Sequence, residues 1–262
     1  MNNEQRFLTV DVGNTQMVFG LYDGETLCAH WRLSSHHQLT SDELSWQLYG
    51  MFSQFEYEPK ALHGIMIASV VPHFDDVLRE ACLQTCGQEP AFIGDPEVKT
   101  GIAIDYKNPK EVGADRIVNA LAARELYGSP AIILDCGTAT TFDVVSASGH
   151  YVGGLIIPGI EVSLEALSKR AAKLPEVAIA PVDTLIGRDT VSSMQSGVYW
   201  SAVDGLNGII NRLLAEDGYA NATIVATGGL AAKLHADMPK VQQLEPHLTL
   251  KGIFMLAKKH FS

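Results

Sequence analysis

A repeated pattern limits the fold of this chain more than any other feature of its sequence. An apolar run leads into Asp11-Val12-Gly13-Asn14-Thr15, and another leads into Asp135-Cys136-Gly137-Thr138. In both places a second β-rich run and a Gly-containing turn follow, and the two aspartates are 124 residues apart. The shared order and spacing indicate an internal duplication, so we predict an α/β protein with two domains, residues 1–117 and 118–262.

Length and charge narrow the class of protein further. The 262 residues suffice for two domains with a core each, and a composition of 47% hydrophobic and 19% charged residues is ordinary for a globular protein. A net charge of −11 argues against non-specific binding to nucleic acid or to an anionic membrane surface. No apolar run approaches the roughly 18 residues of a membrane span, and the first residues lack the apolar middle of a signal peptide. We therefore predict a cytoplasmic protein that binds neither nucleic acid nor membrane.

The four cysteines fit a chain that is kept reduced in the cytosol. Two of them, Cys82 and Cys86, are one helical turn apart, which is a spacing that can hold a metal ion. No second Cys or His pair stands at ligand spacing, and the nine histidines are scattered, which favours plain thiols over a metal site.

Hydrophobic periodicity and turn signals predict strands and helices in both halves of the chain. The predicted strands are 7–10, 17–22, 26–33, 64–71, 131–134, 141–145, 151–157 and 223–226. The predicted helices are one that is capped near Thr40 and runs to about Phe52, then 72–86, one that starts near Arg116, 161–170, and one after Thr190.

The two Asp-X-Gly turns carry the residue types that phosphate binding needs. Glycine lets the backbone approach a ligand closely, and backbone N–H groups and the Thr15 hydroxyl can donate to phosphoryl oxygens. Asp11 can hold Mg²⁺, since hard cations take oxygen ligands. A plain hairpin with an Asx-type turn also explains the first motif taken alone. A third glycine turn, Gly228-Gly229, suits either an adenine ring or an ordinary tight crossover.

Two further segments each have a structural and a functional interpretation. In Gly113-Ala114-Asp115-Arg116, Asp115 is either the N-cap of the next helix or a general base beside Arg116, whose planar guanidinium suits an anionic substrate group. Tyr106 lies just upstream and can close the same pocket. Thr190, in Gly187-Arg188-Asp189-Thr190, is either a helix cap or a hydroxyl that faces the substrate.

The ordered set of motifs resembles type III pantothenate kinases. The motifs that carry the resemblance are Asp11–Thr15, Gly113–Arg116, Asp135–Thr138, Gly153-Gly154 with Pro158-Gly159, Gly187 with Thr190, and the closing segment Glu245–Gly252. They run in order through nearly the whole chain. The resemblance implies the fold of the acetate and sugar kinase, Hsp70 and actin superfamily, in which two duplicated ribonuclease-H-like α/β domains enclose a nucleotide-binding cleft.

The resemblance also implies a reaction and a set of site residues. The family transfers the γ-phosphoryl group of ATP to the 4′-hydroxyl of pantothenate, which is the first step of coenzyme A biosynthesis. The implied ATP-binding residues are Asp11, Val12, Gly13, Asn14, Thr15, Gln16, Met17, Val18 and Thr138. The implied pantothenate-binding residues are Tyr106, Gly113, Ala114, Asp115, Arg116 and Thr190. Asp115 is the implied proton acceptor, and Thr190 comes from the partner subunit of a homodimer. Mg²⁺ accompanies ATP, with Asp11 as a candidate ligand, and Asp135 binds a monovalent cation, K⁺ or NH₄⁺.

Two alternatives keep the fold but change the function. One is a regulatory accessory protein on the same scaffold, and the other is a kinase for a sugar or another small hydroxyl compound. The intact Asp115-Arg116 pair favours catalysis over regulation. Ser201 stands where the family commonly has glycine, and Asn207 where it commonly has an acid. Both lie in a predicted helix away from the motifs, so they bear on packing or dimer contacts.

Overall fold

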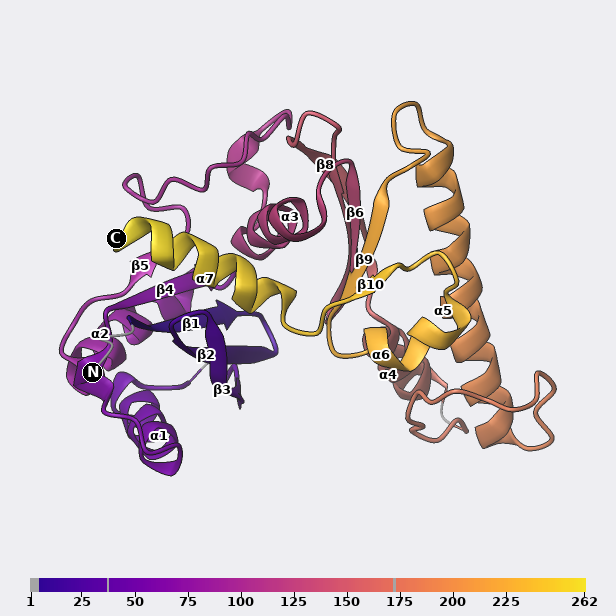
Figure 1. Cartoon of the computed structure of the whole chain (residues 1–262). Coiled ribbons are helices and arrows are strands. Elements are labelled where there is room, and N and C mark those ends of the chain that lie inside the picture. The colour runs from indigo at the N-terminus through magenta and orange to yellow at the C-terminus, as the bar shows by residue number, and fades with distance from the viewer. Residues whose placement is uncertain (1–4, 37, 172) are drawn as a thin grey trace. The chain divides into compact units, whose positions relative to one another are not determined.

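A computed structural model describes residues 5–36, 38–171 and 173–262 and has the α/β character predicted from the sequence (Figure 1). The strands are β1 (Arg6–Val12), β2 (Gln16–Asp23), β3 (Thr26–Ser34), β4 (Gly64–Ser69), β5 (Ala91–Phe92), β6 (Ala131–Cys136), β7 (Ala139–Val145), β8 (Tyr151–Pro158), β9 (Thr223–Thr227) and β10 (Gln243–Leu244). The helices are α1 (Ser41–Gln54), α2 (Asp75–Cys86), α3 (Ala114–Tyr127), α4 (Ile160–Arg170), α5 (Thr190–Ala215), α6 (Ala231–Leu234) and α7 (Leu248–His260). Short 3-10 turns occupy Pro59–Ala61, Pro72–Phe74, Pro109–Glu111 and His235–Asp237.

The strands form two five-stranded sheets with equivalent connections. Their orders are β3-β2-β1-β4-β5 and β10-β9-β6-β7-β8. In the first sheet β1 is antiparallel to β2 and parallel to β4, and in the second β6 is antiparallel to β7 and parallel to β9. Since the first strand of each half takes the central position with the same neighbours, the predicted internal duplication is confirmed.

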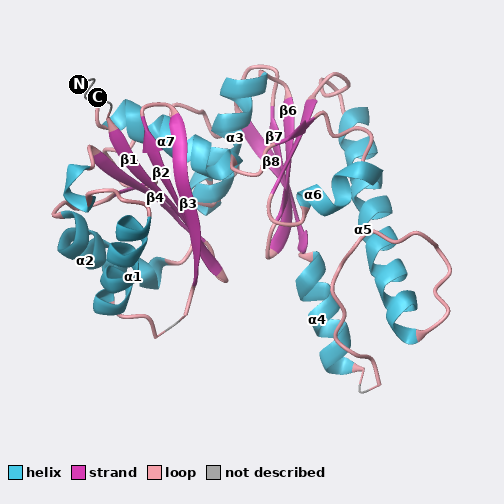
Figure 2. Cartoon of the chain, turned by 60° about the horizontal axis from the view of Figure 1, so that its bottom comes forward, coloured by secondary structure: helices cyan, strands magenta, loops and turns pink. Residues whose placement is uncertain are grey.

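Helices cover both faces of the first sheet. Alternate residues of β1, namely Leu8, Val10 and Val12, face a core that includes Leu48 of α1 and Leu78 of α2. The opposite face packs against α3 and α7 through a second cluster of buried residues (Figure 2). This two-sided burial follows from the near-continuous apolar sequence of β1 and β4.

The second sheet packs one face against the long helix α5 and its neighbours. Ile132 and Leu134 of β6 lie in one buried cluster with Tyr199 and Val203 of α5. The Tyr199 hydroxyl donates to an Asp237 carboxylate oxygen at 2.5 Å. One face of α5 therefore packs against the second sheet over several helical turns.

The two residues that depart from the family pattern lie in α5, where Asn207 bonds to another segment and Ser201 is exposed. The Asn207 amide donates to the Asp237 carbonyl oxygen at 2.9 Å, which ties the helix to the 3-10 turn at His235–Asp237. The Ser201 hydroxyl donates to the Val198 carbonyl oxygen at 3.1 Å, within the helix itself.

Contacts divide the chain into two compact units that are not continuous in sequence. The first contains Met1–Gly101, Asn108–Ala122 and Thr249–Ser262, and the second contains Ile102–Lys107 and Ala123–Leu248. This division differs from the predicted ranges 1–117 and 118–262. The main reason is α7, which returns to the first unit, where the Phe254 ring stacks on Tyr22 with centroids 4.1 Å apart. A contact so distant in sequence leaves no local signal.

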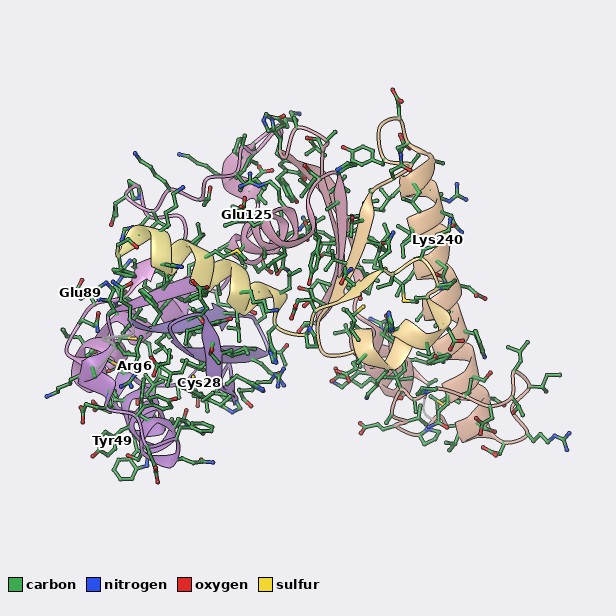
Figure 3. The ribbon with its side chains drawn as sticks, viewed as in Figure 1. Arg6, Cys28, Tyr49, Glu89, Glu125 and Lys240 are labelled. Carbon is green, nitrogen blue, oxygen red and sulfur yellow. The ribbon has the colours of Figure 1, made fainter. Side chains whose placement is uncertain are left out.

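The four cysteines are free thiols, of which Cys28 is exposed (Figure 3). Burial raises the pKa of Cys82 strongly, and it raises the pKa of Cys86 to about 12. Both side chains pack among the apolar core residues of the first unit. None of the helices in the described part of the chain combines the length and the apolar character needed to cross a membrane.

Candidate active site

The first Asp-X-Gly turn connects β1 to β2 and has a defined backbone conformation. The Gly13 N–H donates to the Gln16 carbonyl oxygen at 3.0 Å, and the Ser35 N–H donates to the Thr15 carbonyl oxygen at 2.9 Å. The Ser35 hydroxyl donates to the Gly13 carbonyl oxygen at 2.7 Å. Asn14, Thr15 and Gln16 are exposed. These hydrogen bonds fix the backbone of the turn, while the three side chains at its tip are accessible to a ligand.

The strand residues of this motif lie at the carboxyl end of β1. Asp11 pairs with Val18 of β2 and is partly buried, and Val12 pairs with Met17 and is fully buried. Of these four residues, only Asp11 presents an ionisable side chain, so the other three act through packing and backbone groups.

The carboxyl ends of β1 and β4 lie beside the segment that contains Asp115. Val12 pairs with Ser69 of β4, and the Val70 N–H donates to the Val12 carbonyl oxygen at 3.0 Å. A Cβ atom built on Gly113 would lie 3.3 Å from Val70 Cγ1 and 2.5 Å from Asp115 Oδ1, so these two side chains fill the space beside the Gly113 Cα atom. Val70 therefore lies between the end of β1 and Gly113, two residues before Asp115, within the first unit.

Asp115 lies in the first turn of α3, and its environment changes its acidity. The Gly113 carbonyl oxygen accepts the Ile117 N–H at 3.1 Å, so Gly113 takes the N-cap position and the predicted capping role of Asp115 is wrong. Asp115 Oδ1 instead accepts the Arg116 N–H at 2.8 Å. Burial raises the pKa of Asp115, and the hydrogen bond from Arg116 and its positive charge oppose this in part. A raised pKa makes the carboxylate a stronger proton acceptor.

The second Asp-X-Gly turn connects β6 to β7 and is enclosed by a glycine of the β9 turn. Asp135 pairs with Thr141 of β7 and Thr227 of β9. Gly228 has a φ of +89°, and a Cβ atom built on it would lie 2.5 Å from Asp135 Oδ1 and 2.6 Å from the Cys136 backbone. The third glycine turn therefore lies directly against Asp135, and no side chain fits there.

Thr138 is exposed in the same turn and lies against the end of β8. The Gly159 N–H donates to the Thr138 carbonyl oxygen at 3.1 Å. A Cβ atom built on Gly159 would lie 2.1 Å from that oxygen. Gly159 therefore packs against the backbone of the second Asp-X-Gly turn, where no side chain fits.

Tyr106 and Thr190 both belong to the second unit, whereas Gly113–Arg116 belong to the first. Tyr106 is 40% exposed, in the segment Ile102–Lys107. Thr190 is the first residue of α5, and the N-cap is Asp189, whose carboxylate accepts the Ser192 N–H at 2.9 Å. The interpretation of Thr190 as a cap is therefore wrong, and its hydroxyl does not serve that purpose.

Thr190 lines a cavity of about 740 Å³. Leu167 of α4, Met194 of α5 and the polar residues Arg188 and Ser193 line it as well.

The sequence analysis identified the loop before α5 as a candidate site segment but did not identify Ser193 or Val70. Ser193 lies one helical turn beyond Thr190, and Val70 follows β4 directly, so helical spacing and strand pairing are the signals that identify them.

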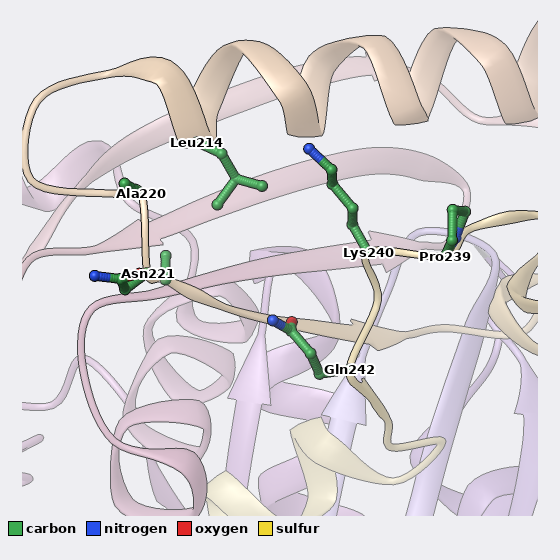
Figure 4. A pocket seen from close by; sticks show the side chains of 7 residues that line it. Leu214, Ala220, Asn221, Pro239, Lys240 and Gln242 are labelled. Carbon is green, nitrogen blue, oxygen red and sulfur yellow. The ribbon is translucent and has the colours of Figure 1, made fainter.

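A second cavity, of about 410 Å³, contains none of the predicted site residues. It lies in the second unit between the end of α5, the start of β9 and the segment that bears Lys240 (Figure 4). Leu214 and Pro239 form apolar walls, and the side chains of Asn221, Lys240 and Gln242 are exposed.

Within the described residues, no group of three or more His, Cys, Asp or Glu side chains could hold a metal ion. Any ion at Asp11 or Asp135 would therefore take most of its ligands from phosphate, backbone carbonyls or water. That donor set fits Mg²⁺ bound with ATP, because Mg²⁺ typically uses one or two carboxylates together with substrate phosphates.

Comparisons with known proteins agree on one family. Residues 7–212 match the family model of type III pantothenate kinase. Proteins named type III pantothenate kinase from Streptomyces coelicolor and Moorella thermoacetica are each 44% identical to this chain, over 261 and 253 residues. The alignments cover 97% of this chain and 98% and 99% of the two relatives.

Solved structures share the fold at low identity. MreB 5 of Spiroplasma citri, bound to AMPPNP, matches with a TM-score of 0.55 and 12% identity, over 97% of this chain and 96% of that one. The ethanolamine utilization protein EutJ from Carboxydothermus hydrogenoformans matches with a TM-score of 0.54 and 15% identity, over 95% and 89%. Together with the two equivalent sheets, these matches confirm the predicted actin-like architecture of two duplicated ribonuclease-H-like domains.

Proposed function

Because the chain belongs to the type III pantothenate kinase family, we propose that it transfers the γ-phosphoryl group of ATP to the 4′-hydroxyl of pantothenate. This reaction is the first step of coenzyme A biosynthesis. The observation that carries the proposal is the position of Val70, which bonds to the end of β1 before the Gly13 turn and lies against Gly113, two residues before Asp115. The Asp11–Thr15 turn, which we propose binds phosphate, and the segment that bears the Asp115 carboxylate both adjoin the carboxyl ends of β1 and β4, and burial raises the pKa of that carboxylate.

The proposed mechanism uses positioning more than covalent chemistry. Phosphoryl transfer passes through a loose transition state, so an enzyme gains most by aligning its substrates and offsetting charge. Backbone N–H groups and the Thr15 hydroxyl bind phosphoryl oxygens at the first turn, and Thr138 does so at the second. Asp115 orients the attacking hydroxyl and accepts its proton, while Arg116 binds the carboxylate of pantothenate.

A kinase of this family implies ATP together with a divalent metal ion. We propose Mg²⁺ as that ion, near Asp11, and a monovalent cation, K⁺ or NH₄⁺, at Asp135. When bound, these ions neutralise part of the phosphate charge. Since ATP is the donor, we place the reaction in the cytoplasm.

We also propose that the protein acts as a homodimer in which Thr190 completes the pantothenate pocket of the partner subunit. The support is a set of exposed apolar side chains in α4, the following loop and α5, of which Leu167 lines the Thr190 cavity. Its members are Val162 and Leu167, each 42% exposed, Leu185 (69%), Ile186 (78%) and Val191 (44%). A surface of this kind favours burial against a second copy of the chain.

The test is ADP release from Mg-ATP with pantothenate, compared with a panel of sugars, in K⁺ buffer and then in Na⁺ buffer. We expect turnover that needs pantothenate and is faster in K⁺. Turnover with sugars but not with pantothenate would show a kinase for another acceptor. ATP binding without any turnover would favour the regulatory alternative.

A further inference from the structure

The segment that bears Tyr106 is attached to the edge of the second sheet next to β8. Ile104 forms a parallel bridge with Tyr151. The Tyr151 N–H donates to the Ala103 carbonyl oxygen at 2.9 Å, and the Asp105 N–H donates to the Tyr151 carbonyl oxygen at 2.8 Å. The Asp105 carboxylate also contacts His150 Nδ1 at 2.8 Å. The backbone that leads into Tyr106 is therefore fixed up to the preceding residue.

The Tyr106 ring itself lies over a glycine of the same strand. Gly153 has a φ of +133°, and a Cβ atom built on it would lie 3.4 Å from Tyr106 Cε2 and 3.6 Å from Cδ2. The space beside the Gly153 Cα atom is thus filled by the phenol ring. Even a methyl group would strain the backbone at this φ, and relief of that strain would shift the part of β8 that supports the ring.

Tyr151 connects this arrangement to the interior of the sheet. Its side chain is fully buried, and its hydroxyl donates to Asp143 Oδ1 at 3.0 Å. Asp143 is fully buried on β7, and its Oδ2 accepts the Thr141 hydroxyl at 3.2 Å. The centroid of the Tyr151 ring is 6.3 Å from that of Tyr106. A buried carboxylate is costly unless it is hydrogen-bonded, so these bonds select one arrangement of β7 and β8.

We propose that Gly153 and Tyr151, with Asp143 behind it, are positioning residues that hold the Tyr106 ring in place for pantothenate. The proposal rests on the proposed function, in which Tyr106 contacts pantothenate. Holding one side chain in its binding position before the substrate arrives removes an ordering cost from binding. These residues therefore set the KM for pantothenate, while kcat and the KM for ATP depend on other groups.

The test compares steady-state kinetics and melting temperatures of Gly153→Ala, Tyr151→Phe and Tyr106→Ala. We expect Gly153→Ala to raise the KM for pantothenate by about fivefold to tenfold, and Tyr151→Phe by about threefold, with kcat and the KM for ATP changed by less than about twofold. Gly149→Ala is the matched control, because Gly149 also has a positive φ, +79°, in the same hairpin but contacts Arg124 rather than Tyr106. It should leave the KM for pantothenate unchanged.

A double variant separates the inference from the proposed function. If Gly153 acts through Tyr106, Gly153→Ala should have no further effect on the KM for pantothenate in the Tyr106→Ala background. If Tyr106→Ala leaves that KM unchanged, the proposed contact of Tyr106 with pantothenate is wrong, and this inference with it. If Tyr106→Ala raises the KM while Gly153→Ala and Tyr151→Phe only lower the melting temperature, the inference alone is overturned.

Discussion

The substitution Asp115→Asn isolates the proposed base with little change in shape. The carboxamide keeps an oxygen that can accept the Arg116 N–H, which in the wild type lies 2.8 Å from Asp115 Oδ1. Since a well-placed general base contributes about 10²-fold to 10⁴-fold, we expect kcat to fall by that factor. The affinity for ATP should stay within about twofold, because the Asp11–Thr15 turn is held by its own backbone and Ser35.

The same substitution that lowers kcat should leave the folded protein as stable as the wild type or make it more stable. Burial raises the pKa of Asp115 in the folded state, so folding disfavours the ionised form that is present at neutral pH. The stability that Asp115 contributes as a neutral acid is complete below its unfolded pKa, near 3.9, and is lost as pH rises through the higher folded pKa. The Asp115→Asn variant should therefore melt at the same temperature as the wild type or higher at pH 7, and the difference should shrink as pH falls towards 3.9.

Kinetics and thermal melting over a pH series measure both effects. In the wild type, kcat/KM should fall as the pH is lowered, with a midpoint above the ordinary pKa of Asp. This fall should be absent in Asp115→Asn. Asp76→Asn is a matched control, because Asp76 is the second residue of α2 as Asp115 is of α3, but it is exposed. A variant at Asp115 with wild-type kcat would refute the assignment. Loss of ATP binding together with a lower melting temperature would show a structural role instead.

Three further predictions concern a glycine contact, a helix cap and the pantothenate pocket. Gly228→Ala should destabilise the protein by about 2 kcal/mol or more in denaturant unfolding, because its methyl group would meet Asp135 Oδ1; Gly218→Ala, at a similar φ of +88° in open space, should cost only about 1 kcal/mol. Thr40→Ala removes the capping box of α1 and should cost about 1 kcal/mol by the same assay, without changing kcat. Thr190→Ala should raise the KM for pantothenate but not that for ATP, and an unchanged KM would contradict its place in the pocket.

Local chemistry accounts for the parts of the fold that the sequence predicted well. The hairpin of β2 and β3 was predicted from two β-rich runs separated by the turn residues Asp23-Gly24. The start of α1 was predicted from Thr40 and Glu43, which form the observed capping box. These signals depend on residues a few positions apart, so a single sequence contains all of them.

Contacts between distant segments account for what was missed. The sequence offered no reason for α7 to join the first unit or for Ile102–Lys107 to join the second, since both depend on pairing across more than 40 residues. The two capping predictions failed because the neighbouring residues, Gly113 and Asp189, suit the cap position as well. Propensity does not choose between adjacent residues of this kind, and the final packing does.

The central claim is that this chain phosphorylates pantothenate, and identification of the product tests it most directly. Phosphorus NMR of a reaction with Mg-ATP and pantothenate in K⁺ buffer would follow ADP and any new phosphate ester together. The account predicts one phosphomonoester, on the 4′-hydroxyl of pantothenate, formed in equal amount to ADP and not formed by the Asp115→Asn variant over the same time. ADP that accumulates with inorganic phosphate, or no reaction by a folded protein that binds ATP, would contradict it.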